Sequence, residues 1–148
     1  MKPKIIIPPV FLFTSLLIIV IIYFLMKNFN IIRFPYNLLG IALIIFGILI
    51  VGKSKQLFIK HNTPHSYEKS TTIVEESIYK YSRNPMYFGM IVFVLGFSVC
   101  FGNIIGIIIP FIFLYIINFV FIPFEEKKME ATFGKQYLEY KSRVRRWI

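Results

Sequence analysis

The chain has 148 residues, 57% of them hydrophobic, and a net charge of +10 at neutral pH. This length fits one domain, residues 1–148, and the apolar content exceeds what a soluble domain of this size carries. The apolar residues gather in four runs of 16 to 18 residues that contain no charge. These runs exclude an ordinary soluble domain and indicate an integral membrane protein.

The four runs predict an all-α fold with four transmembrane helices. A spanning helix needs roughly 17–25 residues, and the flanking residues bring the shorter runs into this range. The first run begins behind Pro8-Pro9, which suits a helix entrance, and we interpret it as an uncleaved span. The predicted spans are residues 8–26, 36–53, 85–101 and 104–122. A loop at 54–84 and an amphipathic helical tail at 123–148 complete the chain.

The basic residues are distributed unequally between the two sides of the predicted membrane. Fifteen of the 17 Lys and Arg residues fall on one side, and only Lys27 and Arg33 fall on the other. The positive-inside rule then places both termini, the loop and the tail in the cytoplasm, as in a bacterial inner-membrane protein. The basic tail is interpreted as a contact to membrane lipid, not to nucleic acid.

The last two spans predict a tight hairpin with polar chemistry at its open end. Asn84 before Pro85 is typical of a helix start, and Gly102-Asn103 provides a short turn between the spans. The hairpin returns the chain to the side it left, so Glu125 and Glu126 are expected near Arg83 and Asn84.

Small residues and a proline mark the packing of this hairpin. Gly89 and Gly96 lie on one face of the third span and are expected to let a neighbouring helix approach closely. Pro110 is expected to kink the fourth span.

Two other features carry little chemistry. Cys100 is the one cysteine of the chain and is interpreted as a small apolar residue. His61 and His65 are four residues apart, but Pro64 between them breaks a helix and no further ligand completes a set, so no metal site is predicted.

Four segments together resemble one enzyme superfamily. Residues 79–89, YKYSRNPMYFG, resemble the signature of the isoprenylcysteine carboxyl methyltransferase and phospholipid methyltransferase superfamily. Glu125-Glu126 resembles its paired glutamates, residues 133–144 resemble its closing segment, and residues 71–74 resemble a short element ahead of the signature. The resemblance covers roughly residues 62–146.

The resemblance implies a small membrane enzyme that transfers a methyl group from S-adenosylmethionine to a lipid-borne carboxylate, amine or thiol. It implies that the loop and the tail form the cofactor side. The implied cofactor-binding residues are Ile73, Val74, Tyr79, Asn84, Pro85, Met86, Tyr87, Glu125 and Glu126. The implied acceptor-binding residues are Arg83 and Asn118, although Arg83 suits the cofactor carboxylate or a lipid phosphate equally well. A methyl group activated by a sulfonium needs alignment and exclusion of water more than a catalytic side chain, and none is assigned.

The sequence departs from the superfamily pattern at two informative positions. Asn84 stands where the eukaryotic carboxyl methyltransferases usually have histidine, and Asn118 lies in the stretch where they use an arginine for the substrate carboxylate. The acceptor therefore stays open.

Other interpretations of these residues and of the whole chain also stay open. The glutamates suit a solvated face beside Lys127 and Lys128, and Tyr79 and Tyr87 suit interfacial anchoring. For the whole chain, the alternatives are an NADPH-dependent enzyme like the membrane sterol reductases and a non-catalytic membrane scaffold.

Overall fold

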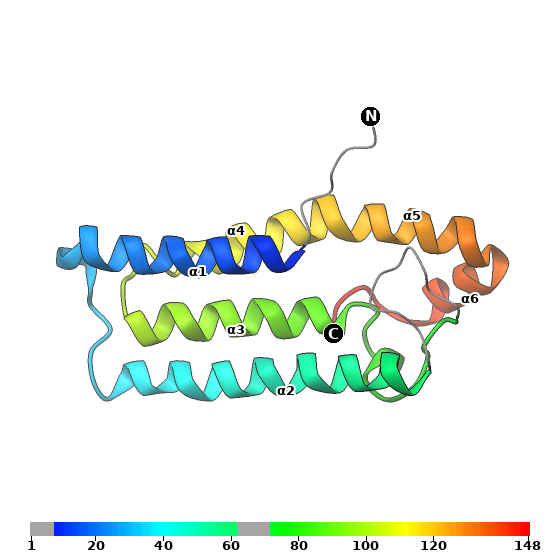
Figure 1. Cartoon of the computed structure of the whole chain (residues 1–148), viewed down its shortest axis with the longest axis horizontal. Coiled ribbons are helices and arrows are strands. Elements are labelled where there is room, and N and C mark those ends of the chain that lie inside the picture. Colours follow the sequence, from blue (N-terminus) through cyan, green and yellow to red (C-terminus); the bar gives the residue numbers. More distant parts are fainter. Residues whose placement is uncertain (1–7, 62–71) are drawn as a thin grey trace.

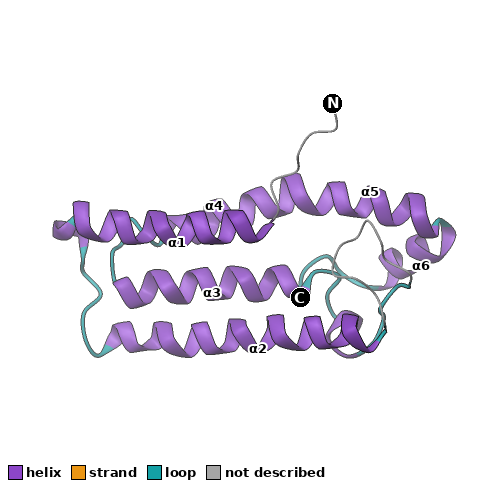
Figure 2. Cartoon of the chain, in the orientation of Figure 1, coloured by secondary structure: helices purple, strands orange, loops and turns teal. Residues whose placement is uncertain are grey.

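The computed structural model describes residues 8–61 and 72–148, and its regular elements are all helices (Figures 1 and 2). The α-helices are α1 (Pro8–Leu25), α2 (Leu39–Lys60), α3 (Pro85–Phe101), α4 (Ile108–Ile116), α5 (Ile122–Phe133) and α6 (Lys135–Arg143). Short 3-10 turns occupy Lys27–Phe29, Tyr36–Leu38 and Ser77–Lys80. The predicted all-α class is confirmed.

Three helices of the described chain are long and apolar enough to cross a membrane: Pro8–Leu25, Tyr36–Lys60 and Ile108–Phe133. Their outward faces expose large apolar side chains such as Phe13 (68%) and Leu49 (64%). Such faces need lipid to cover them. α3 is a shorter apolar helix of 17 residues. The structure therefore indicates an integral membrane protein with three clear spanning candidates, and the count of four remains a prediction.

α2 and α3 pack through backbone contact at matched glycines. A Cβ atom on Gly47 would lie 2.6 Å from the Gly89 carbonyl oxygen, and one on Gly96 would lie 2.6 Å from the Gly40 carbonyl oxygen. The seven-residue spacing repeats on both helices, so each glycine meets a glycine. The prediction for Gly89 and Gly96 is confirmed, and α2 is the neighbour that approaches them.

α4 and α5 form one long helix with a wider turn between them. Residues Ile117–Phe121 adopt π-helical geometry, and Pro123 follows two residues later. Because proline lacks an N–H and its ring crowds the carbonyl one turn earlier, the helix departs from α geometry there. The predicted kink at Pro110 is wrong, since Pro110 lies in the first turn of α4, where no hydrogen bond is lost.

The turn between α3 and α4 is longer than predicted and is organised by a buried amide. Gly102 adopts a left-handed conformation and ends α3, but α4 begins only at Ile108. Asn103 is fully buried. Its Nδ2 donates to Met26 O (2.9 Å) and Asn30 Oδ1 (2.6 Å), and its Oδ1 accepts from Ile105 N (3.0 Å). The predicted helix start at residue 104 is therefore wrong, because Asn103 uses these backbone groups for the turn.

Other predicted helix boundaries differ from those in the structure. α2 continues to Lys60 instead of ending at residue 53, because residues 54–60 contain no glycine or proline to stop it. The tail forms α5 and α6 with a break at Gly134, as the sequence indicates. The predictions for Lys2, Lys4, Pro64 and His65 lie outside the described residues.

The glycine contacts predict a stability difference within one chain. In Gly96→Ala the new methyl group meets the α2 backbone at Gly40 and Ile44, so we expect a loss of about 1–3 kcal/mol of folding stability. Gly52→Ala is the matched control, because a Cβ there meets nothing within 4 Å. Thermal unfolding in detergent measures both variants. Equal unfolding temperatures would contradict the close packing.

Candidate active site

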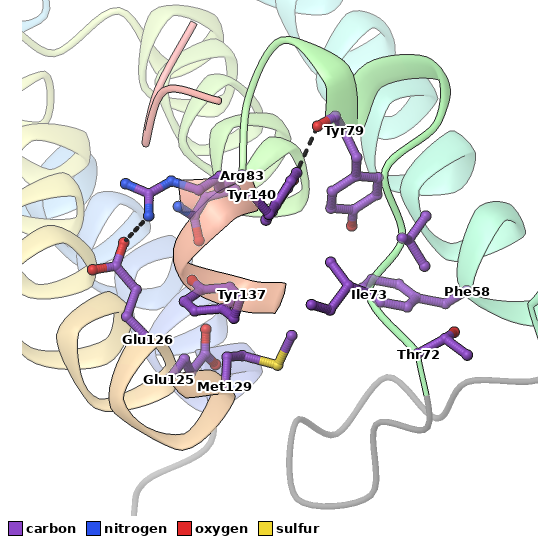
Figure 3. A pocket seen from close by; sticks show the side chains of 12 residues that line it. Phe58, Thr72, Ile73, Tyr79, Arg83, Glu125, Glu126, Met129, Tyr137 and Tyr140 are labelled. Carbon is purple, nitrogen blue, oxygen red and sulfur yellow. Dashed lines mark hydrogen bonds and ion pairs between the residues drawn. The ribbon is translucent and has the colours of Figure 1, made fainter. Parts of the chain in front are cut away.

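The segment before α3 and the helices α5 and α6 enclose a pocket at one end of the bundle. Its empty volume, counted out to the mouth, is about 490 Å³. The lining residues are Phe58, Thr72, Ile73, Val74, Tyr79, Arg83, Asn84, Glu125, Glu126, Met129, Tyr137 and Tyr140 (Figure 3). Phe58 and Tyr140, which are 82 positions apart in sequence, therefore line the same cavity.

Glu126 is the centre of a buried ion-pair cluster. Its carboxylate lies 3.2 Å from Arg83 Nη1, and these two side chains are only 8–9% exposed. Arg146 contacts both oxygens, at 3.3 Å from Nε and 2.9 Å from Nη2. Lys141 Nζ lies 3.5 Å from Glu126 and 2.6 Å from Glu130. One carboxylate thus holds three cations from three different segments.

The segment 144–147 docks beside the start of α3. After α6, Val144 turns to extended backbone, and Arg145 pairs with Ser82 in a parallel bridge. Arg83 N donates to Arg145 O at 2.9 Å, and Asn84 Nδ2 donates to Arg146 O at 3.1 Å. The Asn84 side chain therefore does not cap α3. The helix nevertheless begins at Pro85 as predicted, and Ser82 Oγ accepts from Asn84 N.

Glu125 has a different environment from its neighbour. Its Oε1 accepts a hydrogen bond of 2.6 Å from the Tyr87 hydroxyl, which comes from the first turn of α3. Its Oε2 is buried and has no hydrogen-bond partner among the described residues. Within the same pocket, Arg83 Nε is also buried without a hydrogen-bond acceptor, while Nη1 keeps its ion pair with Glu126. Glu125 Oε2 and Arg83 Nε are therefore free to meet a polar ligand, because buried polar groups are otherwise satisfied.

Three tyrosines form a further wall of the pocket. Tyr140 donates to Tyr79 O at 2.9 Å, and the Tyr79 ring meets Phe58 edge-on at 5.4 Å. Burial raises the pKa of Tyr79 and of Tyr140. It also raises the pKa of Tyr137 to about 12, an effect that Glu126 strengthens and Arg83 opposes. All three hydroxyls therefore remain protonated donors at neutral pH.

Apart from Thr72, the remaining lining is apolar. Val74 packs with Phe58 and Tyr79, and Ile73 packs with Met129 and the two tyrosines of α6. The pocket thus combines an apolar floor with a cationic group and a carboxylate, which suits a ligand that is both planar and charged.

The structure brings most of the predicted site residues together. Those that line the pocket are Ile73, Val74, Tyr79, Arg83, Asn84, Glu125 and Glu126. The predicted meeting of the Arg83 and Glu126 regions is confirmed by their ion pair.

The other predicted site residues lie outside the pocket lining. Pro85 is buried at the start of α3, Met86 packs behind Tyr79, and Tyr87 acts through Glu125. Asn118 lies in the π-helical segment, where its Oδ1 accepts from Trp147 Nε1 at 3.0 Å.

Sequence reasoning missed five lining residues and Arg146. Met129 could have been found, because it lies four residues after Glu125 on the same helix face. Tyr137 and Tyr140 belong to the predicted amphipathic tail; each is only 4% exposed and packs with Ile73 of the loop. No sequence signal singles out Phe58, Thr72 or Arg146.

Comparison with known proteins places the chain in a family of methyltransferases. A profile of the phospholipid methyltransferase family matches residues 35–136, about two thirds of the chain. The chain therefore belongs to this family.

Individual relatives agree with this assignment. The chain is 30% identical over 112 residues to protein-S-isoprenylcysteine O-methyltransferase B of Arabidopsis thaliana, covering 71% of this chain and 55% of the relative. It is 27% identical over 124 residues to the Saccharomyces cerevisiae protein-S-isoprenylcysteine O-methyltransferase, covering 75% and 51%. An uncharacterized protein of Haemophilus influenzae is 35% identical over 63 residues, its whole length and 43% of this chain. The chain thus spans about half the length of the isoprenylcysteine methyltransferases it matches.

The two glutamates are expected to respond differently to loss of charge. In Glu126→Gln the buried Arg83 loses its anion and three cations face each other, so we expect a loss on the order of 3 kcal/mol. Glu125→Gln keeps an acceptor for Tyr87 and removes an unpaired charge, so the stability should change little. Thermal unfolding without ligand measures both. A larger loss in Glu125→Gln would show that the assignment of the two roles is reversed.

Proposed function

We propose that this protein is an S-adenosylmethionine-dependent methyltransferase that acts within the membrane on a lipid-soluble acceptor. The observation that carries the proposal is the presence, in one pocket, of a buried Arg83 Nε without a hydrogen-bond acceptor and a buried Glu125 oxygen without a donor. S-adenosylmethionine carries a carboxylate, an amino group, ribose hydroxyls and a planar base, which match these groups and the apolar floor. Family membership supports the same reading.

Each pocket residue then has a proposed role. Arg83 binds the cofactor carboxylate through the Nε side of its guanidinium, and Glu125 accepts from the amino group or the ribose hydroxyls. Ile73, Val74 and Met129 contact the base. Tyr87 orients Glu125, and Glu126 acts as a positioning residue because it holds Arg83 in place.

The start of α3 lies beside the charged residues of the pocket. Asn84 and Pro85 fix where the helix begins, and the Asn84 amide ties this point to the segment 144–147. Met86 supports Tyr79 from behind.

When bound, the cofactor supplies an activated methyl group. The residues of this chain have to align the acceptor with it and exclude water. The buried rings of Tyr79, Tyr137 and Tyr140 serve the exclusion of water.

The class of acceptor follows from the surroundings and from the relatives. The exposed apolar faces of the helices are in contact with lipid, so an acceptor of the isoprenylcysteine type, or a lipid amine or thiol, reaches the site from the membrane. No arginine is present in Ile117–Phe121, and Asn118 is bonded to Trp147. If the acceptor is a carboxylate, this part of the site recognises it by a neutral amide.

We also propose four passes through the membrane with the pocket on the cytoplasmic side. α3 is only 17 residues long, yet its two glycines contact α2 at points seven residues apart, so the two helices lie side by side at the same depth. If α2 crosses the bilayer, α3 does too. The excess of Lys and Arg at the pocket end favours the cytoplasm for that end.

Ligand binding tests the proposed activity. We expect purified protein in detergent to bind S-adenosylhomocysteine saturably in calorimetry and not to bind NADPH. Glu125→Gln and Arg83→Lys should weaken the binding about 10-fold or more, because each removes a charge-assisted hydrogen bond. Lys135→Gln, an exposed charge at the same end, is the control and should bind normally. Binding of NADPH instead would indicate a reductase, and binding of neither ligand would indicate a scaffold.

Labelling of introduced cysteines tests the topology. In a Cys100→Ser background, we expect Lys27→Cys to react with a membrane-impermeant maleimide in intact cells. Lys135→Cys should react only after lysis, because it lies in the tail on the other side. Reaction of both, or of neither, in intact cells would contradict four passes.

A further inference from the structure

A second cavity lies at the end of the bundle opposite the candidate active site, where α1 is joined to α2 (Figure 1). Its empty volume, counted out to the mouth, is about 960 Å³. The lining residues are Tyr23, Lys27, Asn30, Ile32, Arg33, Phe34, Asn37, Cys100 and Phe101. None of these residues takes part in the proposed methyl transfer.

The two cations of this cavity have no counter-charge. Lys27 and Arg33 are the two basic residues at this end, and both line the same space. All seven acidic residues of the chain fall at or after Glu68, and the six that are described lie at 75–139, toward the other end of the bundle. No ion pair of either cation is therefore present among the described residues.

The polar walls contain one further unsatisfied group. Asn30 uses its Oδ1 to accept from Asn103 at 2.6 Å, so it is committed to the turn. Asn37 Oδ1 is buried and has no hydrogen-bond donor among the described residues. The cavity thus offers two free cations and one free acceptor, which fits a ligand with an anionic group and a hydroxyl or ammonium donor.

The rim of the cavity is apolar and faces outward. The Tyr23 and Phe101 rings meet edge-on at 5.2 Å, and Phe34 is 77% exposed. Leu25 at the end of α1, two residues before Lys27, is 79% exposed. A ligand with a polar head and acyl chains would place its head among the cations and its chains against these side chains.

We propose that this cavity binds the headgroup of an anionic phospholipid. Its phosphate lies between Lys27 and Arg33, because the guanidinium and the ammonium both pair well with phosphate oxygens. A headgroup hydroxyl donates to Asn37. The alternative is that the two cations merely extend into water at the membrane surface, and it predicts no lipid preference.

Lipid retention measured by native mass spectrometry tests this site. The purified protein is incubated with phosphatidylglycerol, which is anionic and carries hydroxyl donors, or with phosphatidylcholine, which is neutral and carries none. We expect a single retained phosphatidylglycerol at concentrations where phosphatidylcholine is not retained. The double variant Lys27→Gln/Arg33→Gln should bind phosphatidylglycerol at least 10-fold more weakly, since each basic group contributes to anionic-lipid attraction.

Matched variants and a competitor decide between the outcomes. Lys55→Gln/Lys135→Gln removes the same charge at the other end and should retain the lipid normally. Lys27→Arg should keep the binding, and thermal unfolding reports whether each variant folds. If millimolar glycerol phosphate competes with the lipid, the phosphate alone is recognised. If it does not compete, the acyl chains contribute to binding. Equal retention of the two lipids, or an equal loss of phosphatidylglycerol retention in both double variants, would overturn the proposal. This outcome is independent of whether the protein binds S-adenosylhomocysteine.

Discussion

The arrangement of the polar end depends on the carboxylate of Glu126. It joins the segment before α3, the helices α5 and α6, and the segment 144–147, through Arg83, Lys141 and Arg146. A charge buried this deeply is tolerated only when partners surround it, and the three cations would repel one another without it. Because the Arg83 side chain also lines the pocket, the same ion pairs that hold the fold position a group for ligand binding.

Adjacent positions on a helix explain how two identical residues take different roles. Successive side chains on an α-helix point about 100° apart. Glu126 therefore faces the basic segments, while Glu125 faces Tyr87 on α3 and keeps one oxygen unpaired. A pair of glutamates thus supplies one group for structure and one for a ligand.

The sequence predicted the helical class and the hairpin, because apolar runs and the Asn84-Pro85 helix start are local signals. It predicted the glycine contact on α3 for the same reason, but not its partner on α2, because pairing between helices is not a local property. Most of the predicted pocket residues came instead from the resemblance to the methyltransferase superfamily. The roles of Tyr140 and Arg146 could not be predicted either. Tyr140 depends on how α6 packs against Tyr79, and Arg146 on how the chain after α6 folds back onto Ser82 and Arg83, and no spacing in the sequence encodes either contact. The kink was assigned to Pro110, whereas the distortion precedes Pro123, since a proline disturbs a helix only beyond its first turn.

The glycine contacts between α2 and α3 have a mechanical consequence. Backbone touching backbone leaves no side chains that could repack, so these two helices behave as one rigid body. Phe58 at the end of α2 and Asn84 at the start of α3 belong to this rigid half of the pocket wall. Glu125 and Met129 follow the π-helical turn, where the hydrogen-bonding pattern already departs from the regular helix. Any widening of the pocket must therefore come from movement of α5. That helix would bend at residues 117–121 relative to the rigid pair of α2 and α3.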